Sequence, residues 1–268
     1  MRTDLYTCPI CGEKLIAETK SYYCKNRHCY DESKAGYVNL LPVNKKNSAF
    51  PGDNKDMIKA RVDVMNNGYY LPLANEIISI LNKTSPKFVL DAGCGTGYIP
   101  YKLKETFTDS EIIGTDISKY AIEYASKRYK NVAFAVASSV RLPVENSVFD
   151  ALICAFAPVY KEEFARVLKK GGYFFRVVPA EKHLFNLKEF LYDEARINED
   201  EPVEIQGFEF IEKRIIKNTL NLSGDVVESI IKMTPYYYHT PPKMLEKLKS
   251  LEQMIVETEF ELRVYLIK

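Results

Sequence analysis

The 268-residue chain carries 37 Lys and Arg against 36 Asp and Glu, and 46% of its residues are hydrophobic, as in an ordinary globular protein. Its apolar runs are too short and too interrupted to span a bilayer, and it opens with no signal-peptide pattern, so we expect a cytoplasmic protein rather than a membrane or secreted one. The net charge of +1 hides an asymmetry, because residues 1–61 hold eleven Lys or Arg against seven Asp or Glu. A basic front end favours a polyanionic partner, and the alternative is a solvated surface.

Cysteine and histidine spacing near the N-terminus predicts a zinc site. Cys8 and Cys11 form a C-x2-C pair on a turn, and Cys24 with His28 follows at the distance of a hairpin. Two thiolates on a knuckle and a second ligand pair are what tetrahedral zinc needs, and in a cytosolic protein such cysteines favour metal over a disulfide. Either His28 or the adjacent Cys29 can supply the fourth ligand, and we favour His28. Four protein ligands close the site, which makes it structural rather than catalytic.

The next elements are a small hairpin over residues 14–23 and a helix over about 54–66. Asp53 is placed to cap the start of that helix, and Gly68 follows its end. Tyr70 lies just before a further helix, where its ring either packs in the core or faces a ligand.

A strand–loop–helix unit begins at residue 88. Residues 88–90 predict a buried parallel strand, and residues 98–106 predict the helix that follows. Alternating glycines between them let the backbone turn sharply and let a ligand approach closely. Tyr98 occupies the place of the third glycine of a dinucleotide fingerprint, so the pattern is D-x-G-x-G-x-G, led by Asp91.

A second strand, over residues 111–116, ends in Asp116, about twenty residues beyond the glycines. The glycine pattern followed by this acid resembles the first two motifs of class I S-adenosylmethionine-dependent methyltransferases. The resemblance implies that the loop wraps the amino-acid end of the cofactor and that the Asp116 carboxylate accepts both ribose hydroxyls. The implied cofactor-binding residues of the loop are Asp91, Gly93, Gly95, Thr96 and Gly97.

A helix over 117–129 and a third strand over 132–136 follow. In related folds the residues after that strand border the adenine, which makes Ser138 a candidate. A fourth strand is expected over 151–158, and its end lacks the Asp or Asn that methyltransferases of exocyclic amino groups usually carry. This departure favours a ring nitrogen as the methyl acceptor, and Phe156 either stacks on the base or packs in the core.

The C-terminal part is less regular. We expect Gly171 or Gly172 to cap a helix, and the aromatic cluster from Met233 to His239 either stacks on unpaired bases or packs as a lid. The predicted elements are helices at 162–168 and 184–192 and strands at 173–178, 208–220 and 255–267.

The segment between the zinc ligands and the glycine loop carries a more specific resemblance. It contains Gly36-Tyr-Val-Asn-Leu-Leu-Pro42, Pro51-Gly-Asp53, Met57, Ala60-Arg61 and Gly68-Tyr-Tyr70. With the zinc knuckle and the glycine loop, this series resembles the 23S ribosomal RNA guanine-N1 methyltransferases over nearly the whole chain. The resemblance implies that Tyr70 contacts the cofactor and that His183 lines the cofactor pocket.

The fold that this resemblance implies is α/β: a Rossmann-like class I methyltransferase domain with a mostly parallel seven-stranded sheet, preceded by a small zinc module. We divide the chain into a zinc-binding RNA-recognition module at 1–45, a helical connector at 46–84 and the methyltransferase domain at 85–268. The family also implies a homodimer whose two zinc modules form one RNA cleft. Its members modify different nearby guanines, and some of them protect ribosomes from macrolides.

The implied reaction transfers a methyl group from S-adenosylmethionine to N1 of a guanine in a hairpin loop of 23S rRNA. N1 lies on the pairing edge, so the target base has to be unpaired or flipped out. The sequence does not indicate which group accepts the proton that leaves N1. One alternative is a methyltransferase for a small molecule or a protein, which would not need the basic zinc front. A non-catalytic RNA-binding protein is the other, and the intact Asp91, glycine and Asp116 set argues against it.

Overall fold

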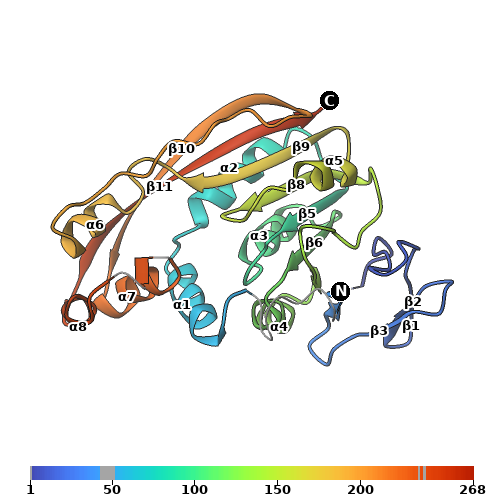
Figure 1. Ribbon diagram of the computed structural model, residues 1–268, viewed down its shortest axis with the longest axis horizontal. Coiled ribbons are helices and arrows are strands. Elements are labelled where there is room, and N and C mark those ends of the chain that lie inside the picture. The colour runs from blue at the N-terminus through green and yellow to red at the C-terminus, as the bar shows by residue number, and fades with distance from the viewer. Residues whose placement is uncertain (1, 43–51, 235, 238–239) are drawn as a thin grey trace.

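A computed structural model describes residues 2–42, 52–234, 236–237 and 240–268. Its main feature is an eight-stranded sheet in the order β10-β11-β9-β8-β5-β6-β7-β4, and a separate three-stranded sheet, β1-β2-β3, lies in the N-terminal segment (Figure 1). The strands are β1 (Ile16–Glu18), β2 (Ser21–Tyr23), β3 (Cys29–Asp31), β4 (Val38–Asn39), β5 (Phe88–Ala92), β6 (Glu111–Asp116), β7 (Ala133–Val136), β8 (Phe149–Ala155), β9 (Leu168–Pro179), β10 (Phe208–Leu222) and β11 (Met254–Ile267).

Six neighbouring strands of the large sheet, from β9 to β4, run parallel, and β11 and β10 continue it antiparallel. The prediction of a mostly parallel sheet is therefore confirmed. The predicted number of seven strands is wrong, because β4 pairs with β7 and adds an eighth strand at the edge. That strand comes from the N-terminal segment, which the sequence pattern had not connected to the sheet.

Different parts of the chain cover the two faces of the sheet. On β5, Val89 packs in one hydrophobic cluster and Leu90 in the other, because successive strand residues point to opposite faces. The first cluster contains side chains from α1 to α4 and from α6 to α8, and the second contains those of α5. The N-terminal segment contributes to both clusters, and mostly to the second. The helices are α1 (Lys55–Asn66), α2 (Leu71–Leu81), α3 (Tyr98–Thr106), α4 (Lys119–Arg128), α5 (Lys161–Val167), α6 (Phe185–Leu191), α7 (Gly224–Lys232) and α8 (Pro242–Lys249).

The N-terminal segment thus packs against the sheet and does not stand apart from it. Tyr6 and Leu15 are almost fully buried and belong to the second hydrophobic cluster. The N–H of Thr7 donates to the carbonyl of Pro143 at 2.9 Å, which fixes the segment to the loop after β7. Since a parallel sheet is stable only with both faces covered, this segment contributes to the stability of the whole molecule.

The N-terminus of α1 differs from the predicted one. Its cap is Asn54, whose side-chain oxygen accepts a hydrogen bond from the N–H of Met57 at 3.0 Å. Asp53, the predicted cap, forms an ion pair with Arg61 instead. Asn and Asp are about equally good caps, so the sequence alone does not decide between two neighbouring candidates.

The predicted glycine cap of α5 is also wrong. The helix ends at Val167, and the backbone is already extended at Leu168, where β9 begins. Gly171 and Gly172 lie inside that strand and cap no helix. The predicted helices at 98–106 and 184–192, and the strands at 208–220 and 255–267, are present with shifts of a few residues.

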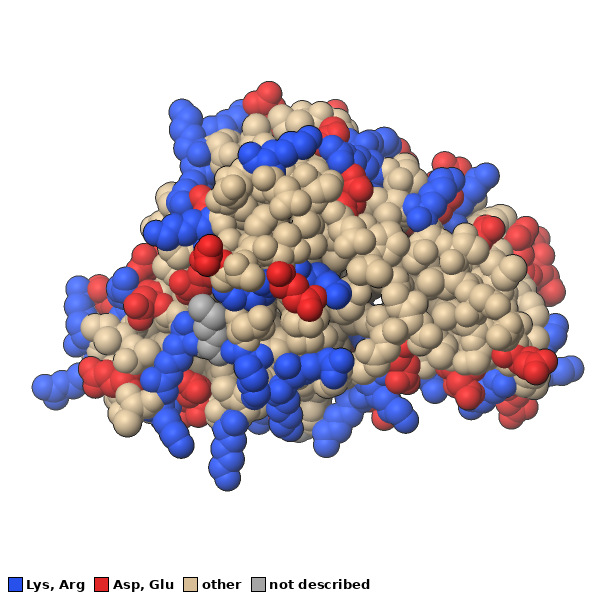
Figure 2. All heavy atoms as spheres, turned by 180° about the vertical axis from the view of Figure 1, so that it is seen from behind, with Lys and Arg blue, Asp and Glu red and all other residues tan. Residues whose placement is uncertain are grey.

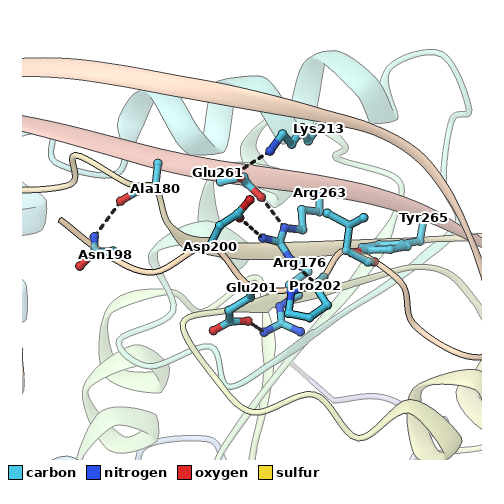
Figure 3. Close-up of polar contacts among 11 residues, drawn as sticks. Arg176, Ala180, Asn198, Asp200, Glu201, Pro202, Lys213, Glu261, Arg263 and Tyr265 are labelled. Carbon is cyan, nitrogen blue, oxygen red and sulfur yellow. Dashed lines mark hydrogen bonds and ion pairs between the residues drawn. The ribbon is translucent and has the colours of Figure 1, made fainter.

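Polar contacts on β11 hold the segment that follows α6 (Figure 3). The side chain of Arg263 is 1% exposed, pairs with Glu261 and reaches Asp200 at 3.4 Å. The hydroxyl of Tyr265 donates to the carbonyl of Val203 at 2.8 Å. A buried guanidinium is tolerated only when paired charges offset its lost hydration, and these contacts supply them.

Some predictions fall on residues that the structure does not describe. These are the domain boundary between 45 and 46, the Pro51 of the P-G-D sequence, and Pro235, Tyr238 and His239 of the aromatic cluster. Within the described ranges, no helix has the length and apolar character needed to cross a membrane.

Candidate functional site

Three thiols and one imidazole converge beside the N-terminal hairpin. The Nδ1 of His28 lies 3.4 Å from the Sγ of Cys8 and of Cys24 and 3.5 Å from that of Cys11, and the last two sulfurs are 3.7 Å apart. Tetrahedral zinc, with bonds of about 2.3 Å to sulfur and about 2.0 Å to nitrogen, places its ligands roughly 3.5–3.8 Å from one another. These four residues therefore fit a structural zinc ion, as the spacing predicted.

The surroundings of the cluster decide between the two candidate fourth ligands. Cys29 is exposed and lies outside the cluster, so His28 is the ligand present. A hydrogen bond from the backbone of Glu13 lowers the pKa of Cys11 to about 6, which favours the thiolate that zinc requires. The hydroxyl of Tyr30 lies 3.2 Å from the Sγ of Cys8, and burial raises the pKa of this tyrosine, so its O–H remains a donor to the sulfur.

The glycine loop lies at the adjoining ends of β5 and β6. The N–H groups of Gly93 and Cys94 donate to the carbonyl of Thr115 at 2.8 and 3.0 Å, which turns the chain across the end of β6. Gly93 has a φ of +92°, and a Cβ there would lie 2.9 Å from the Cβ of Ala157. Gly97 begins α3 with a φ of +78°, and a Cβ there would lie 2.8 Å from Ala125. Both positions require glycine.

The strand ends open into a cavity of about 460 Å³. Its wall comes from the carboxyl ends of β5, β6, β7 and β8, where ligands of open α/β sheets bind, and from α1 and the start of α2. Thr96 is buried behind the loop, and its hydroxyl points to the sulfur of Met65 at 2.9 Å. Thr96, Gly97 and His183 do not line this cavity. The predicted cofactor residues that do line it are Tyr70, Asp91, Gly93, Gly95, Asp116 and Ser138.

Asp116 ends β6 and fixes the loop through backbone hydrogen bonds. Its Oδ2 accepts from the N–H of Gly95 at 2.9 Å, and its Oδ1 accepts from the N–H of Ser118 at 2.8 Å. Burial raises the pKa of this carboxyl, and the two N–H groups oppose that rise. Because each carboxylate oxygen can accept more than one hydrogen bond, Asp116 can still receive hydroxyls from a ligand.

Asp91 is the more unusual of the two acids. It is 1% exposed, and its Oδ1 has no hydrogen-bond partner among the described residues. Burial, and then the charge of Asp116, raise the pKa of Asp91 well above its usual range. An unpaired buried carboxylate oxygen is unfavourable unless a ligand supplies a donor or a positive charge. S-adenosylmethionine carries an ammonium and a sulfonium, so its chemistry fits this pair of acids.

Tyr70 and Phe156 line the same cavity as the two acids and form an aromatic wall. The rings of Tyr70 and Phe156 stack with centroids 5.5 Å apart, and Phe260 contacts both edge-on at 5.5 and 5.6 Å. His183 contacts Tyr69, whose hydroxyl lies 3.1 Å from its Nε2, and Phe260, and neither His183 nor Tyr69 is among the residues that line the cavity. His183 therefore lies behind the wall.

Sequence reasoning did not place the polar corner made by Asp53 and Arg61 in this site. Both residues line the cavity and pair with each other, and the hydroxyl of Ser118 donates to the carbonyl of Asp53 at 2.7 Å. The acid and the arginine are eight positions apart, so they lack the three- or four-residue spacing that marks a pair on one helix. Only the resemblance of Pro51-Gly-Asp53 and Ala60-Arg61 to a family pattern pointed to this corner.

The residues that line the cavity are suited to binding and positioning a ligand rather than to nucleophilic attack. Burial raises the pKa of Cys94, and it raises that of Cys154, behind the wall, to about 12, so both remain thiols. No histidine is among the residues that line the cavity in the described part of the chain. Two carboxylates, a glycine loop and an aromatic surface can hold a cationic nucleoside and exclude water from it.

Comparison with known proteins agrees with this geometry. Residues 6–49 match a family of zinc ribbons described as RlmA, N-terminal, and residues 83–224 match a methyltransferase domain. The chain is 29% identical over 252 residues to the 23S rRNA (guanine(748)-N(1))-methyltransferase of Streptomyces fradiae, covering 90% of this chain and 88% of the relative. It is 28% identical over 279 residues to a Bacillus subtilis protein provisionally named 23S rRNA (guanine-N(1)-)-methyltransferase, covering 97% and 96%. A Micromonospora griseorubida protein of the same provisional name is 26% identical over 277 residues, covering 94% and 93%.

The methyltransferase match covers the glycine loop, both acids and all the strand ends that form the cavity, and the zinc-ribbon match covers the four metal ligands. The chain therefore belongs to the methyltransferase domain family, as an S-adenosylmethionine-dependent enzyme with a zinc ribbon ahead of its catalytic domain.

Proposed function

We propose that this enzyme transfers a methyl group from S-adenosylmethionine to N1 of a guanine in a hairpin loop of 23S rRNA. Three relatives matched over at least 88% of their length carry names of that activity. The observation that carries the proposal is the cavity with an unpaired buried carboxylate, Asp91, beside Asp116, in a chain that also has the zinc tetrad. We place the enzyme in the cytoplasm, where its RNA substrate is found.

On this proposal the chain's own residues divide the cofactor between them. Asp116 accepts the ribose hydroxyls, Asp91 and the loop from Gly93 to Gly97 border the amino-acid end, and Ser138 borders the adenine. Tyr70 contacts the cofactor from the aromatic wall, while Thr96 and His183 support residues in contact with it. When bound, the cofactor supplies an electrophilic methyl group on its sulfonium.

The acceptor side of the cavity lies at the end of β8. Ala155, Phe156, Ala157 and Pro158 line it and present no side-chain acceptor for an exocyclic amino group. This composition supports a ring nitrogen as the methyl acceptor. Among the described residues that line the cavity there is no histidine, and Cys94 remains a thiol, so we expect positioning of the base against the methyl group to supply most of the rate enhancement.

We propose that the zinc ribbon (1–45) and a basic edge formed by α1 of the connector (46–84) and α4 of the catalytic domain (85–268) bind the RNA. Figure 2 shows Lys and Arg side chains along the lower edge of the molecule, the side where Figure 1 has α1 and α4. Lys127, which contacts Glu123 at 2.6 Å, and then Lys119 and Lys55 lower the pKa of that glutamate, and all three lysines are exposed. Three lysines therefore surround a single carboxylate, which leaves positive charge available to bind RNA phosphates. The residues 46–84 connect the two RNA-binding parts, and we expect a homodimer whose paired ribbons form one cleft.

The decisive experiment is mass mapping of 23S rRNA from cells with and without the gene. We expect one N1-methylguanine to disappear on deletion, and to return with the wild-type gene but not with Asp116→Ala. An unchanged rRNA methylation map would contradict the proposal. Transfer of label from S-adenosylmethionine to a small molecule or a protein, without RNA binding, would support the alternative. Macrolide sensitivity of the two strains would show whether the modification protects the ribosome.

A further inference from the structure

Phe156 has a backbone conformation and an exposure that are both unusual for phenylalanine. It follows the last residue of β8 with a φ of +56°, in the left-handed region that bulky residues rarely adopt. Of the described non-glycine residues with positive φ, it alone lines the cofactor cavity. Its side chain is 38% exposed although the strand before it is part of the core. A strained aromatic residue at the end of a central strand calls for a functional explanation.

Contacts on both sides fix this strained turn. The N–H of Phe156 donates to the carbonyl of Val177 on β9 at 3.0 Å. On the other side, the Cβ of Ala157 lies so close to Gly93 that a Cβ on the glycine would approach to 2.9 Å. The turn is therefore held between β9 and the glycine loop, and the direction of the Phe156 ring is set by both.

The ring is supported on one side and accessible on the other. Tyr70 stacks on it at 5.5 Å with an interplanar angle of 16°, and Phe260 meets it edge-on at 5.6 Å. Tyr70 is only 7% exposed and Phe260 is fully buried, so the backing is rigid. Phe156 is 38% exposed and is among the residues that line the cavity. A residue that served packing alone would not need an open face there.

The strand order separates this ring from the predicted place of the cofactor's nucleoside. Along the sheet the order is β8-β5-β6-β7. Asp116 ends β6 and Ser138 comes after β7, on one side of the glycine loop that follows β5, whereas Phe156 follows β8 on the other side. A nucleoside bound at Asp116 and Ser138 leaves the end of β8 for the methyl acceptor. Ala155 and Ala157 offer no polar side chain at that end, and Phe156 between them supplies an aromatic surface.

We propose that Phe156 is the stacking platform for the acceptor guanine, with Tyr70 as its backing. This inference rests on the proposed function and adds the residue that holds the flipped-out base. A base stacked on an aromatic ring keeps its N1 edge free to point toward the methyl donor. The residue with the left-handed backbone is thus the one whose ring lines the cavity.

The test compares two substitutions of Phe156 with a matched control. Phe156→Leu removes the flat ring, Phe156→Tyr keeps it, and Phe210→Leu changes a phenylalanine of nearly the same exposure, 39%, on β10, which does not line the cavity. The measurements are kcat and KM for methyl transfer to 23S rRNA from the deletion strain, the Kd of S-adenosylhomocysteine by calorimetry, and the melting temperature. We expect kcat/KM for RNA to fall roughly 10–100-fold in Phe156→Leu, as for the loss of one base–aromatic stack. Phe156→Tyr should stay within about threefold of wild type, as should Phe210→Leu, because both keep the platform.

Each departure from that pattern points to a different conclusion. Equal kcat/KM for Phe156→Leu and wild type would overturn the inference, and so would a parallel loss of S-adenosylhomocysteine affinity, which would make the ring part of the cofactor site. A large drop in melting temperature in Phe156→Leu, with neither kcat/KM nor melting temperature restored in Phe156→Tyr, would assign the ring to packing. If wild-type enzyme transfers no methyl group to rRNA, the proposed function fails and this inference fails with it.

Discussion

The zinc site and the cofactor cavity are built in opposite ways. The four zinc ligands come from 21 consecutive residues, Cys8 to His28, and short turns alone bring them together. The residues of the cavity come from a span that begins at Gly52 and ends at Tyr160, and parallel strand pairing brings them to one sheet edge. A local site can be read from spacing, whereas a site made by topology needs the fold.

The two regions also differ in what stabilises them. The strands β1, β2 and β3 have three residues each and are largely exposed, so the ribbon relies on its metal, as small zinc modules do. The cavity lies at the ends of strands whose central residues, such as Leu90 and Ile113, are fully buried. The contrast is not complete, because Tyr6 and Leu15 of the N-terminal segment cover part of the sheet.

The largest effect should come from removing a zinc ligand. Cys24→Ser leaves three ligands, and because structural zinc contributes roughly 10–16 kcal/mol to small modules, we expect loss of stoichiometric zinc, unfolding of the ribbon and no detectable RNA methylation. The Kd of S-adenosylhomocysteine should rise by no more than about threefold if the cavity depends on its own strands alone. Zinc content by mass spectrometry, calorimetry and RNA methylation check these outcomes.

Cys29→Ser is the matched control, because Cys29 is exposed and lies outside the zinc cluster. It should change neither zinc content nor methylation. If Cys24→Ser lowers the cofactor affinity as strongly as it lowers RNA methylation, the ribbon and the sheet form one cooperative unit. The contacts of Tyr6 and Leu15 with the sheet would then transmit the loss of zinc to the cofactor cavity.

Next in size is Asp116→Ala. The substitution removes the acceptor for Gly95 and Ser118 and, on our proposal, the acceptor for the ribose, so at least two charge-assisted hydrogen bonds are lost. We expect the Kd of S-adenosylhomocysteine to rise by about 100-fold or more, while the zinc content stays at one ion per chain. Asp109→Ala, an exposed acid just before β6, serves as the control. An unchanged Kd in Asp116→Ala would remove the basis for placing the cofactor here.

A smaller and more specific effect is expected for Asp91→Asn. The cofactor-free protein buries a carboxyl whose pKa is raised by burial and by Asp116, so stability is lost as pH rises through the range between the unfolded and folded pKa values. The amide removes this penalty, and we expect the cofactor-free variant to be more stable than wild type by about 1 kcal/mol at pH 8. S-adenosylhomocysteine should bind roughly 30-fold more weakly, because the partner of its ammonium has lost its charge. Urea unfolding and calorimetry measure both, and a destabilised variant with wild-type affinity would contradict the assignment.

The contrast between the two sites explains what the sequence could predict. Cys8, Cys11, Cys24 and the favoured His28 follow from spacing, and Asp116 follows from a strand that ends in an acid after a glycine loop. These patterns involve residues that lie close together in the sequence, so they can be recognised without knowledge of tertiary contacts. The strands β5 to β11 and the helices α1 to α6 were predictable for the same reason, since their apolar periodicity is local.

What sequence reasoning missed depends on contacts between distant residues. The carbonyl of Asp53 binds Ser118, 65 positions away, and nothing near Asp53 indicates more than a helix cap. The eighth strand is only two residues long and exists because Val38 pairs with Ala135. The strain at Phe156 likewise arises from β9 and the glycine loop together.

His183 gives the smallest predicted effect and tests where the aromatic wall ends. Its Nδ1 accepts from the N–H of Glu259 at 3.3 Å, so its Nε2 carries the proton that the hydroxyl of Tyr69 receives, and burial lowers its pKa to about 4. Because the unfolded chain binds a proton below about pH 6.5 and the folded one does not, stability is intact above that pH and falls as pH drops toward 4. Between pH 8 and pH 5.5, wild type should lose about 1.4 kcal/mol more of its free energy of unfolding than His183→Gln, with both proteins zinc-replete. The same variant should bind S-adenosylhomocysteine within about threefold of wild type at pH 8, because the imidazole contacts Tyr69 and does not line the cavity. Parallel pH profiles would show that the imidazole is solvated, and a large loss of affinity would move His183 from behind the wall into the cofactor site.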